Sequence, residues 1–246
     1  MLNFAFDKKT ITIVLLVMLV IWLLNAGSGG ILRLVLTIPG VLIALTFHEF
    51  AHAWMATKMG DETPKNQGRL SLNPIKHVDP MGLILLVIAG FGWGKPVEID
   101  PRNFNGKRSL SAAEAIVAAA GPIMNFILAF VLLIIYYLII VTNLLRGLSN
   151  EWQEIILIVT STAIYINIGL GIFNLIPLPP LDGSKILMHF LPGKGKEWFY
   201  RNQRVFYIVF LILFISGLSS YILTPIFSAV FTGMEWVVAK IFGLFM

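Results

Sequence analysis

The stretch ALTFHEFAHAWMA, residues 44–56, places two histidines and a glutamate inside a run that is otherwise almost entirely apolar. On a helix, residues four apart lie one above the other, so His48 and His52 project from one face and can reach the same metal ion. Glu49 points about 100° away from His48, which suits a carboxylate that takes a proton from a water at the metal. The alternative is that all three are core or interfacial residues satisfied by hydrogen bonds.

The composition assigns this stretch to a membrane. Of the 246 residues, 57% are hydrophobic and only 13% are charged, whereas about a quarter of the residues in a water-soluble domain are charged. Unpaired polar groups in hydrocarbon are costly, so three adjacent ones require a compensation such as a metal. Because the chain has no cysteine, the ligands of a zinc ion must be histidines or carboxylates.

Apolar runs set the expected architecture, since about 20 helical residues cross a hydrocarbon core. Six runs reach or approach this length, and they cover approximately 10–26, 31–57, 111–142, 155–176, 205–223 and 225–246. A seventh run, 81–94, has only 14 residues and ends in glycines, so we expect it to enter the membrane and return on the same side. Residues 95–99, KPVEI, predict a short edge strand, because Pro96 cannot pair as a central strand does.

The predicted fold is therefore an all-α membrane protein with about six transmembrane helices and a re-entrant, β-like loop between the second and third. We expect residues 1–246 to form a single domain with a catalytic core at about 31–190. With a cytoplasmic N-terminus, all 18 Lys and Arg except Arg33 and Arg146 fall on the cytoplasmic side, together with the HEFAH end of the second helix. The net charge of +5 thus reflects topology, and we expect a lipid bilayer rather than nucleic acid as the partner.

We expect a third metal ligand on another helix that reaches the same side of the membrane as HEFAH. FNLIPLPPLDGSK, residues 173–185, contains three prolines that break the helix at membrane depth, and unwound backbone there must line a cavity. Asp182 is the only carboxylate in that stretch, and its oxygen is of the type that completes a two-histidine zinc site. Asp182 also suits a helix cap for residues 184–191. The residues by themselves leave both roles open.

Together, HEFAH, GPIMN at 121–125 and NLIPLPPLDG at 174–183 resemble the site-2 protease family of intramembrane zinc metalloproteases. The loop NQGRLSLNPIKHVDPMG, 66–82, is similar to that of the compact bacterial and archaeal members, and we find no PDZ-like or CBS-like stretch. The resemblance implies that His48, His52 and Asp182 bind one zinc ion and that Glu49 is catalytic.

We expect the two asparagines of these motifs to contact the substrate. In GPIMN, Gly-Pro predicts a kink that turns Asn125 inward, where its amide would bond substrate backbone or a developing oxyanion. Asn174 suits the same role. The alternative for both is hydrogen bonding between helices, as buried asparagine does in membranes. His77 lies in a basic loop, and we expect it at the surface.

The expected activity is zinc-dependent hydrolysis of peptide bonds within the membrane, in regulated intramembrane proteolysis of single-pass proteins or remnant signal peptides. A substrate helix must unwind to expose a carbonyl, and the extended backbone then needs an edge to pair with. The predicted edge strand supplies it, through Lys95, Pro96, Val97, Glu98 and Ile99. Two alternatives remain at this point: a metal or ion transporter, which needs no base at position 49, and a scaffold that binds membrane helices without cutting them.

Overall fold

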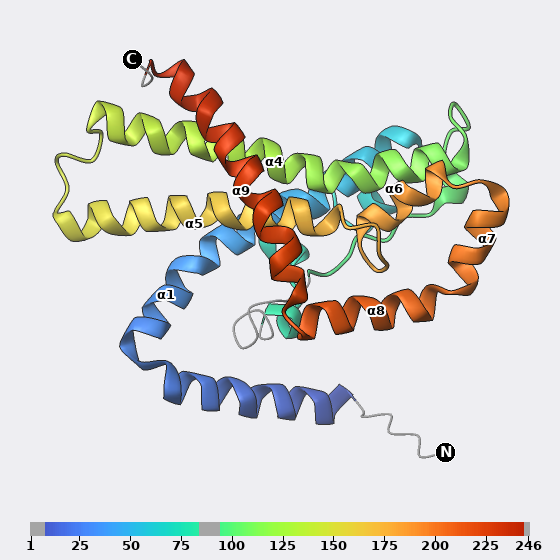
Figure 1. Cartoon of the computed structure of the whole chain (residues 1–246), viewed down its shortest axis with the longest axis horizontal. Coiled ribbons are helices and arrows are strands. Elements are labelled where there is room, and N and C mark those ends of the chain that lie inside the picture. The colour runs from blue at the N-terminus through green and yellow to red at the C-terminus, as the bar shows by residue number, and fades with distance from the viewer. Residues whose placement is uncertain (1–7, 84–93, 244–246) are drawn as a thin grey trace.

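The computed structural model describes residues 8–83 and 94–243, and its regular structure is helical. The first helix, α1 (Lys8–Met59), is bent into two arms at Gly27 (Figure 1). Gly27 has φ 62° and ψ 179°, a conformation that costs little only for a residue without Cβ. The bend separates the first apolar run from the arm that carries His48 and His52.

Two long antiparallel helices and a series of shorter ones follow α1 (Figure 1). In chain order these are α2 (Thr63–Asn66), η1 (Pro74–Lys76), η2 (Pro101–Asn103), α4 (Leu110–Thr142), α5 (Asn150–Asn174), α6 (Asp182–Phe190), α7 (Gly193–Arg201), α8 (Gln203–Ile215) and α9 (Leu218–Ile241). The start of α4 is capped by Ser109, whose hydroxyl accepts from Ala112 N at 3.3 Å. Its end is marked by Asn143 in the left-handed region, with φ 51°.

The expectation of an all-α membrane protein is confirmed. Within the described residues, four helical segments are long and apolar enough to cross a membrane. They are Gly29–Met59, Leu110–Thr142, Asn150–Asn174 and Leu218–Ile241. They correspond to four of the six predicted spans.

The predicted division between the last two spans is wrong. The stretch 205–223 is interrupted at Gly217, which has φ 73° and precedes the first residue of α9. At 1.5 Å per residue, the 13 residues of α8 extend about 20 Å, too short for a hydrocarbon core of about 30 Å. The run is apolar on both sides of Gly217, so hydropathy alone does not register the break.

Of α8 and α9, only α9 is long and apolar enough to be a candidate span among the described residues, and its end packs against α4. The Tyr137 hydroxyl, near the end of α4, donates to Glu235 Oε1 at 2.9 Å, and the Tyr137 ring stacks on Phe242. The end of α9 therefore lies beside the end of α4, away from the HEFAH end of α1. We therefore propose that Lys240 lies on the side opposite to the one that the sequence predicted.

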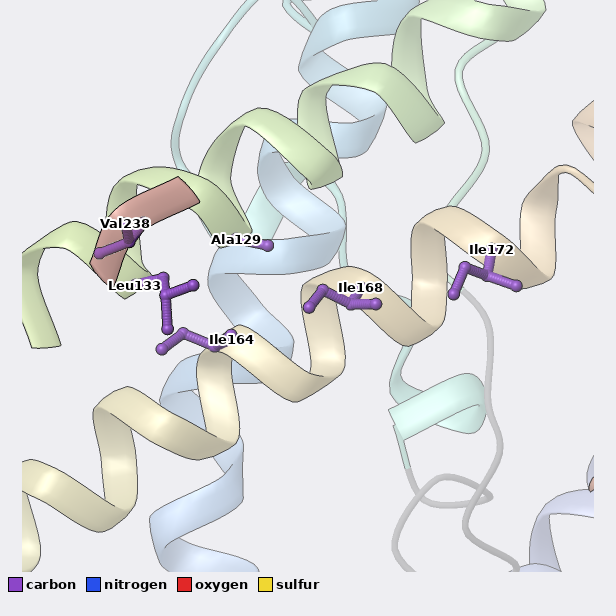
Figure 2. Packing of buried hydrophobic residues seen from close by; sticks show 6 residues of the cluster. All are labelled: Ala129, Leu133, Ile164, Ile168, Ile172 and Val238. Atoms are coloured by element: carbon purple, nitrogen blue, oxygen red, sulfur yellow. The ribbon is translucent and has the colours of Figure 1, made fainter. Parts of the chain in front are cut away.

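The second arm of α1 packs against both α4 and α5, and the contacts are close because small residues line them. A Cβ at Gly40 would lie 2.9 Å from Cα of Ala163, so α1 and α5 touch almost backbone to backbone there. Beyond this contact, side chains of α4, α5 and α9 form an apolar cluster (Figure 2). Its members are Ala129, Leu133, Ile164, Ile168, Ile172 and Val238.

The prediction of a strand at 95–99 is wrong. In the described part of the chain no regular strand forms, and an isolated antiparallel bridge pairs Val78 with Gly94. Residues 95–100 then run on without regular secondary structure. The re-entrant run predicted at 81–94 lies mostly outside the described residues, because these stop at 83 and resume at 94.

Candidate metal centre

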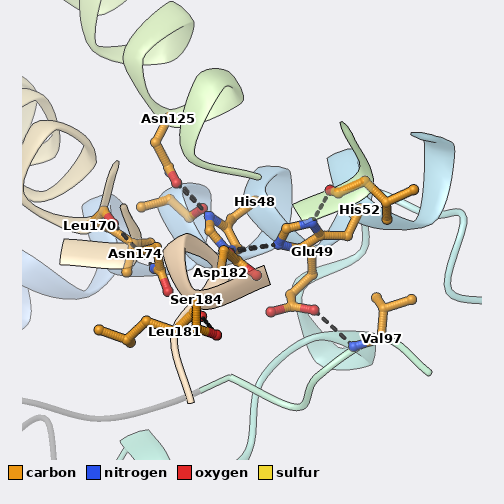
Figure 3. Close-up of polar contacts among 12 residues, drawn as sticks. His48, Glu49, His52, Val97, Asn125, Leu170, Asn174, Leu181, Asp182 and Ser184 are labelled. Atoms are coloured by element: carbon orange, nitrogen blue, oxygen red, sulfur yellow. Dashed lines mark hydrogen bonds and ion pairs between the residues drawn. The ribbon is translucent and has the colours of Figure 1, made fainter. Parts of the chain in front are cut away.

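Three predicted ligand side chains converge in one place (Figure 3). His48 and His52 come from α1, and Asp182 is the first residue of α6. The Nε2 atoms of the two histidines are 3.0 Å apart, and each lies 3.2 Å from Asp182 Oδ2. The capping alternative for Asp182 does not hold, because Leu181 is the N-cap of α6 and no side-chain capping bond forms. Tertiary folding thus brings together residues 130 positions apart.

The outer nitrogens of both rings have fixed partners. His48 Nδ1 lies 2.7 Å from Asn125 Oδ1, and His52 Nδ1 lies 2.8 Å from the carbonyl oxygen of Val117. Amide and carbonyl oxygens only accept hydrogen bonds, so each Nδ1 carries the hydrogen. Each neutral ring therefore presents a lone pair at Nε2, which is the tautomer that binds a metal.

This donor set fits a zinc ion. Two Nε2 lone pairs and a carboxylate oxygen facing one another at 3.0–3.2 Å repel unless a cation lies between them. A tetrahedral zinc ion with bonds of about 2.0–2.1 Å holds its ligand atoms roughly 3.3 Å apart. Both histidines are buried, at 4% and 6% exposed, so water competes little for the site.

Glu49 lies next to this cluster on α1. Its Oε2 accepts a hydrogen bond from Val97 N at 2.9 Å, while its other oxygen lies on the side of Asp182 (Figure 3). Two ring nitrogens, one carboxylate and a second, differently bonded carboxylate are the components of a hydrolytic metal site.

Comparison with known proteins gives the same assignment. The model of peptidase family M50 matches residues 36–217. The chain belongs to peptidase family M50. YwhC of Bacillus subtilis (strain 168), named as a candidate zinc metalloprotease, is 40% identical over 194 residues, which cover 77% of this chain and 84% of YwhC. The resemblance to site-2 proteases is thereby confirmed, and the chain is a membrane zinc metalloprotease.

More distant relatives are found in other organisms. Rip2 of Mycolicibacterium smegmatis is 29% identical over 214 residues, covering 77% of each chain. MJ0611 of Methanocaldococcus jannaschii is 26% identical over 188 residues, covering 74% of this chain and 84% of the relative. Both are also named as candidate zinc metalloproteases. No solved structure gives a significant match.

In this M50 peptidase, the Asn125 side chain bonds His48, a predicted metal ligand, and does not face open space. Asn125 is fully buried, and besides the bond to His48 its Nδ2 donates to the carbonyl of Ala44 at 3.1 Å and to Asn167 Oδ1 at 3.0 Å. A contact with substrate would require it to give up one of these bonds. We therefore expect Asn125 to act through the orientation of His48.

Two further asparagines, Asn174 and Asn167, lie on α5. Asn174 Nδ2 donates to Leu170 O within its own helix at 3.1 Å, and its role toward substrate remains a prediction. Asn167, which the sequence reasoning missed, is fully buried and also donates to Ala163 O at 2.8 Å. Its position as an amide in the middle of the apolar run 155–176 is the sequence feature that could have identified it.

The expectation for His77 is wrong. His77 is fully buried, and its Nε2 donates to the carbonyl of Ser71 at 2.6 Å. Burial lowers the pKa of His77 below its ordinary value, which keeps the ring neutral. Arg69 in the same loop is buried as well, at 5% exposed. Composition predicted a solvated basic loop, but long-range packing buries these side chains against the segment that begins at Gly94.

Proposed function

We propose that this M50 peptidase hydrolyses peptide bonds within transmembrane segments or remnant signal peptides, in regulated intramembrane proteolysis. The observation that carries the proposal is the position of the site. His48, His52 and Glu49 lie on Gly29–Met59, a helical segment long and apolar enough to cross a membrane. A peptide bond cut there must come from a membrane-embedded chain, which favours single-pass proteins as substrates.

In this proposal one zinc ion per chain is held by His48 Nε2, His52 Nε2 and Asp182 Oδ2. Bound zinc supplies a Lewis acid that polarises the scissile carbonyl and acidifies a water. Asn125 and Val117 hold the two rings in the ligating tautomer. The buried surroundings exclude competing water and so strengthen the attraction between these charged groups.

Glu49 is the proposed general base and acid. Its Oε2 is engaged by Val97 N, so its other oxygen takes the proton as the water oxygen attacks the carbonyl carbon. When the carbon–nitrogen bond breaks, Glu49 returns that proton to the departing amine. One water is consumed, and a carboxyl and an amino group are produced.

The segment Lys95–Ile99 remains our proposal for substrate docking, although it forms no regular strand. Lys95 N donates to His77 O at 2.7 Å and Val97 N donates to Glu49, so these alternate residues bond toward the protein. In an extended chain the residues between them face the other way. Pro96 then offers its carbonyl, and Glu98 its amide and carbonyl, to an extended substrate.

We also propose that the site lies toward the cytoplasmic side of the cell membrane. After the reassignment of Lys240, the Lys and Arg residues placed on the other side are three of the 18 in the chain. They are Arg33, Arg146 and Lys240. Cationic residues are retained in cytoplasmic loops. All the other Lys and Arg residues lie on the side of the metal centre, which favours a cytoplasmic position for the loops next to it.

The test is cleavage of single-pass membrane substrates by purified protein, with Glu49→Gln as the variant. Gln keeps nearly the same shape but cannot accept the proton, so cleavage should fall by about 10²- to 10⁴-fold while zinc remains bound. A zinc chelator should abolish the wild-type activity, and added zinc should restore it.

Metal analysis of the same preparations provides the control. We expect about one zinc per chain in the wild type and in Glu49→Gln, and a loss in Asp182→Ala and His52→Ala. Cleavage by Glu49→Gln at the wild-type rate, with zinc bound, would show that Glu49 is not the base.

A further inference from the structure

The loop motif NQGRLSLNPIKHVDPMG, 66–82, has no role in the mechanism above, yet two of its charged or titratable side chains are buried. Arg69 is 5% exposed and His77 is fully buried. A buried guanidinium is costly unless its donors find acceptors. The partners of Arg69 therefore indicate what the loop is built to hold.

Arg69 joins two parts of the chain that are distant in sequence. Its Nη1 donates to the carbonyl of Lys76 and its Nη2 to the carbonyl of Lys95, 26 positions away. Beside it, Lys95 N donates to His77 O at 2.7 Å, and Val78 forms the bridge to Gly94. Both the amide and the carbonyl of Lys95 are thus fixed to the loop.

That fixed point lies two residues before Val97, whose amide donates to Glu49 Oε2 at 2.9 Å. The far end of the segment is fixed too, because Asp100 N donates to the buried Asp61 Oδ2 at 2.8 Å. The Val97 amide is therefore held from both sides. The contacts run from Arg69 and His77 through Lys95 and Val97 to Glu49.

We propose that Arg69 is a positioning residue for the catalytic carboxylate, holding the Val97 amide on Glu49 Oε2 so that the other oxygen faces the water. The inference rests on the proposed role of Glu49 as the base. A carboxylate free to rotate presents either oxygen at varying distance, and a misplacement of about 1 Å costs roughly 100-fold in rate.

The chemistry favours arginine at this position. The two carbonyls belong to different segments, and one planar guanidinium reaches both with separate nitrogens in a fixed geometry. Lysine has a single nitrogen on a flexible stem, so Arg69→Lys should restore only part of the function that Arg69→Gln loses. Lys65, in α2 directly before the loop, is a control, because it is exposed and its Nζ pairs with Glu62 at 3.1 Å.

The first measurement is hydrogen exchange of residues 95–99 in the zinc-loaded protein, resolved to single amides, which requires no proteolysis of a substrate. In Arg69→Gln the Val97 amide should exchange at least about tenfold faster, as expected when a hydrogen bond to a charged acceptor is lost. Glu49→Ala should have the same effect on Val97, and Lys65→Gln should have none. Unchanged protection of Val97 in Arg69→Gln overturns the inference even if the wild type cleaves its substrates.

The second measurement separates positioning from general stability. We expect Arg69→Gln and Val97→Pro, which removes the Val97 amide donor, to lower kcat by about 10- to 100-fold, more than they change KM, with zinc content unchanged. In Glu49→Asp the shorter side chain loses the Val97 bond, so adding Arg69→Gln should lower kcat little further. Multiplicative losses in the double variant would show that Arg69 acts independently of Glu49.

Discussion

At the scale of single residues, the metal centre depends on the absence of a side chain at Gly121. A Cβ at this position of α4 would lie 2.7 Å from His48 Nε2 and closer still to Nε2 of His52. These are the atoms that we propose as zinc ligands. Gly121 thus lets α4 approach α1 closely enough for Val117 and Asn125 to bond the outer nitrogens of the same rings.

We predict that Gly121→Ala loses zinc. The added methyl must displace one or both rings, and disturbing the groups that orient metal ligands already costs about 10- to 100-fold in affinity. Zinc titration of the metal-free variant would measure this loss.

Gly169→Ala in α5 is the matched control for that prediction, since a Cβ there meets nothing within 4 Å. It should bind zinc as the wild type does. Wild-type zinc affinity in Gly121→Ala would mean that the two helices separate without disturbing the rings.

At the scale of elements, the loops beside the metal centre are joined by Asp61. This buried carboxylate accepts from Thr63 N at 3.0 Å, Thr63 Oγ1 at 2.5 Å, Asn103 Nδ2 at 2.9 Å and Asp100 N at 2.8 Å. It therefore ties the end of α1 to the segment that carries Val97. Burial raises the pKa of Asp61, but its hydrogen bonds together hold it below the ordinary value.

We predict that this connection opens in acid. A carboxyl whose pKa is lower in the folded than in the unfolded state stabilises the fold above its unfolded pKa of 3.8. That contribution is lost as pH falls through the lower folded pKa. Hydrogen exchange at residues 100–105, corrected for intrinsic rates, should therefore accelerate as the pH falls below 3.8.

The variant Asp61→Asn should show rapid exchange at residues 100–105 already at neutral pH, with little further acceleration in acid. Glu62→Gln is the control, because Glu62 is exposed and pairs only with Lys65 among the described residues. Exchange in Asp61→Asn that follows the wild-type pH dependence would assign the acid opening to another group.

At the scale of the whole molecule, the route of the last two helices decides on which side the chain ends. The contacts of Tyr137 with Glu235 and Phe242 place the end of α9 beside the end of α4. Because α8 is short, we predict that α8 and α9 together make one crossing in place of the two that the sequence predicted. The predicted six spans would instead return the C-terminal end to the side of the metal centre.

Cysteine labelling in intact cells tests this route, since the chain has no native cysteine. We predict that an impermeant reagent labels Asn150→Cys and Lys240→Cys from outside and leaves Lys65→Cys unlabelled. Opening the cells should make Lys65→Cys reactive. Protection of Lys240→Cys alongside Lys65→Cys would restore two crossings, and external labelling of Lys65→Cys would invert the orientation of the metal centre.

The sequence by itself determined the membrane class, the all-helical fold and the side chains that gather at the metal centre. Apolar length indicates the membrane class and the helices, and the four-residue spacing pairs His48 with His52. For Asp182 the residues left two roles open, and the resemblance to site-2 proteases favoured the ligand. The helical period fixes which residues share a face, whatever the rest of the chain does.

Only the tertiary structure decided how those residues are held. Asn125 bonds His48 across 77 positions and Val97 bonds Glu49 across 48, and no local pattern encodes such pairings. Hydropathy marked the loop of Arg69 and His77 as solvated, although Arg69 donates to the carbonyls of Lys76 and Lys95, and His77 Nε2 bonds the carbonyl of Ser71, in the interior. Hydrogen-bond partners depend on packing between distant segments, whereas composition records only whether a side chain is polar.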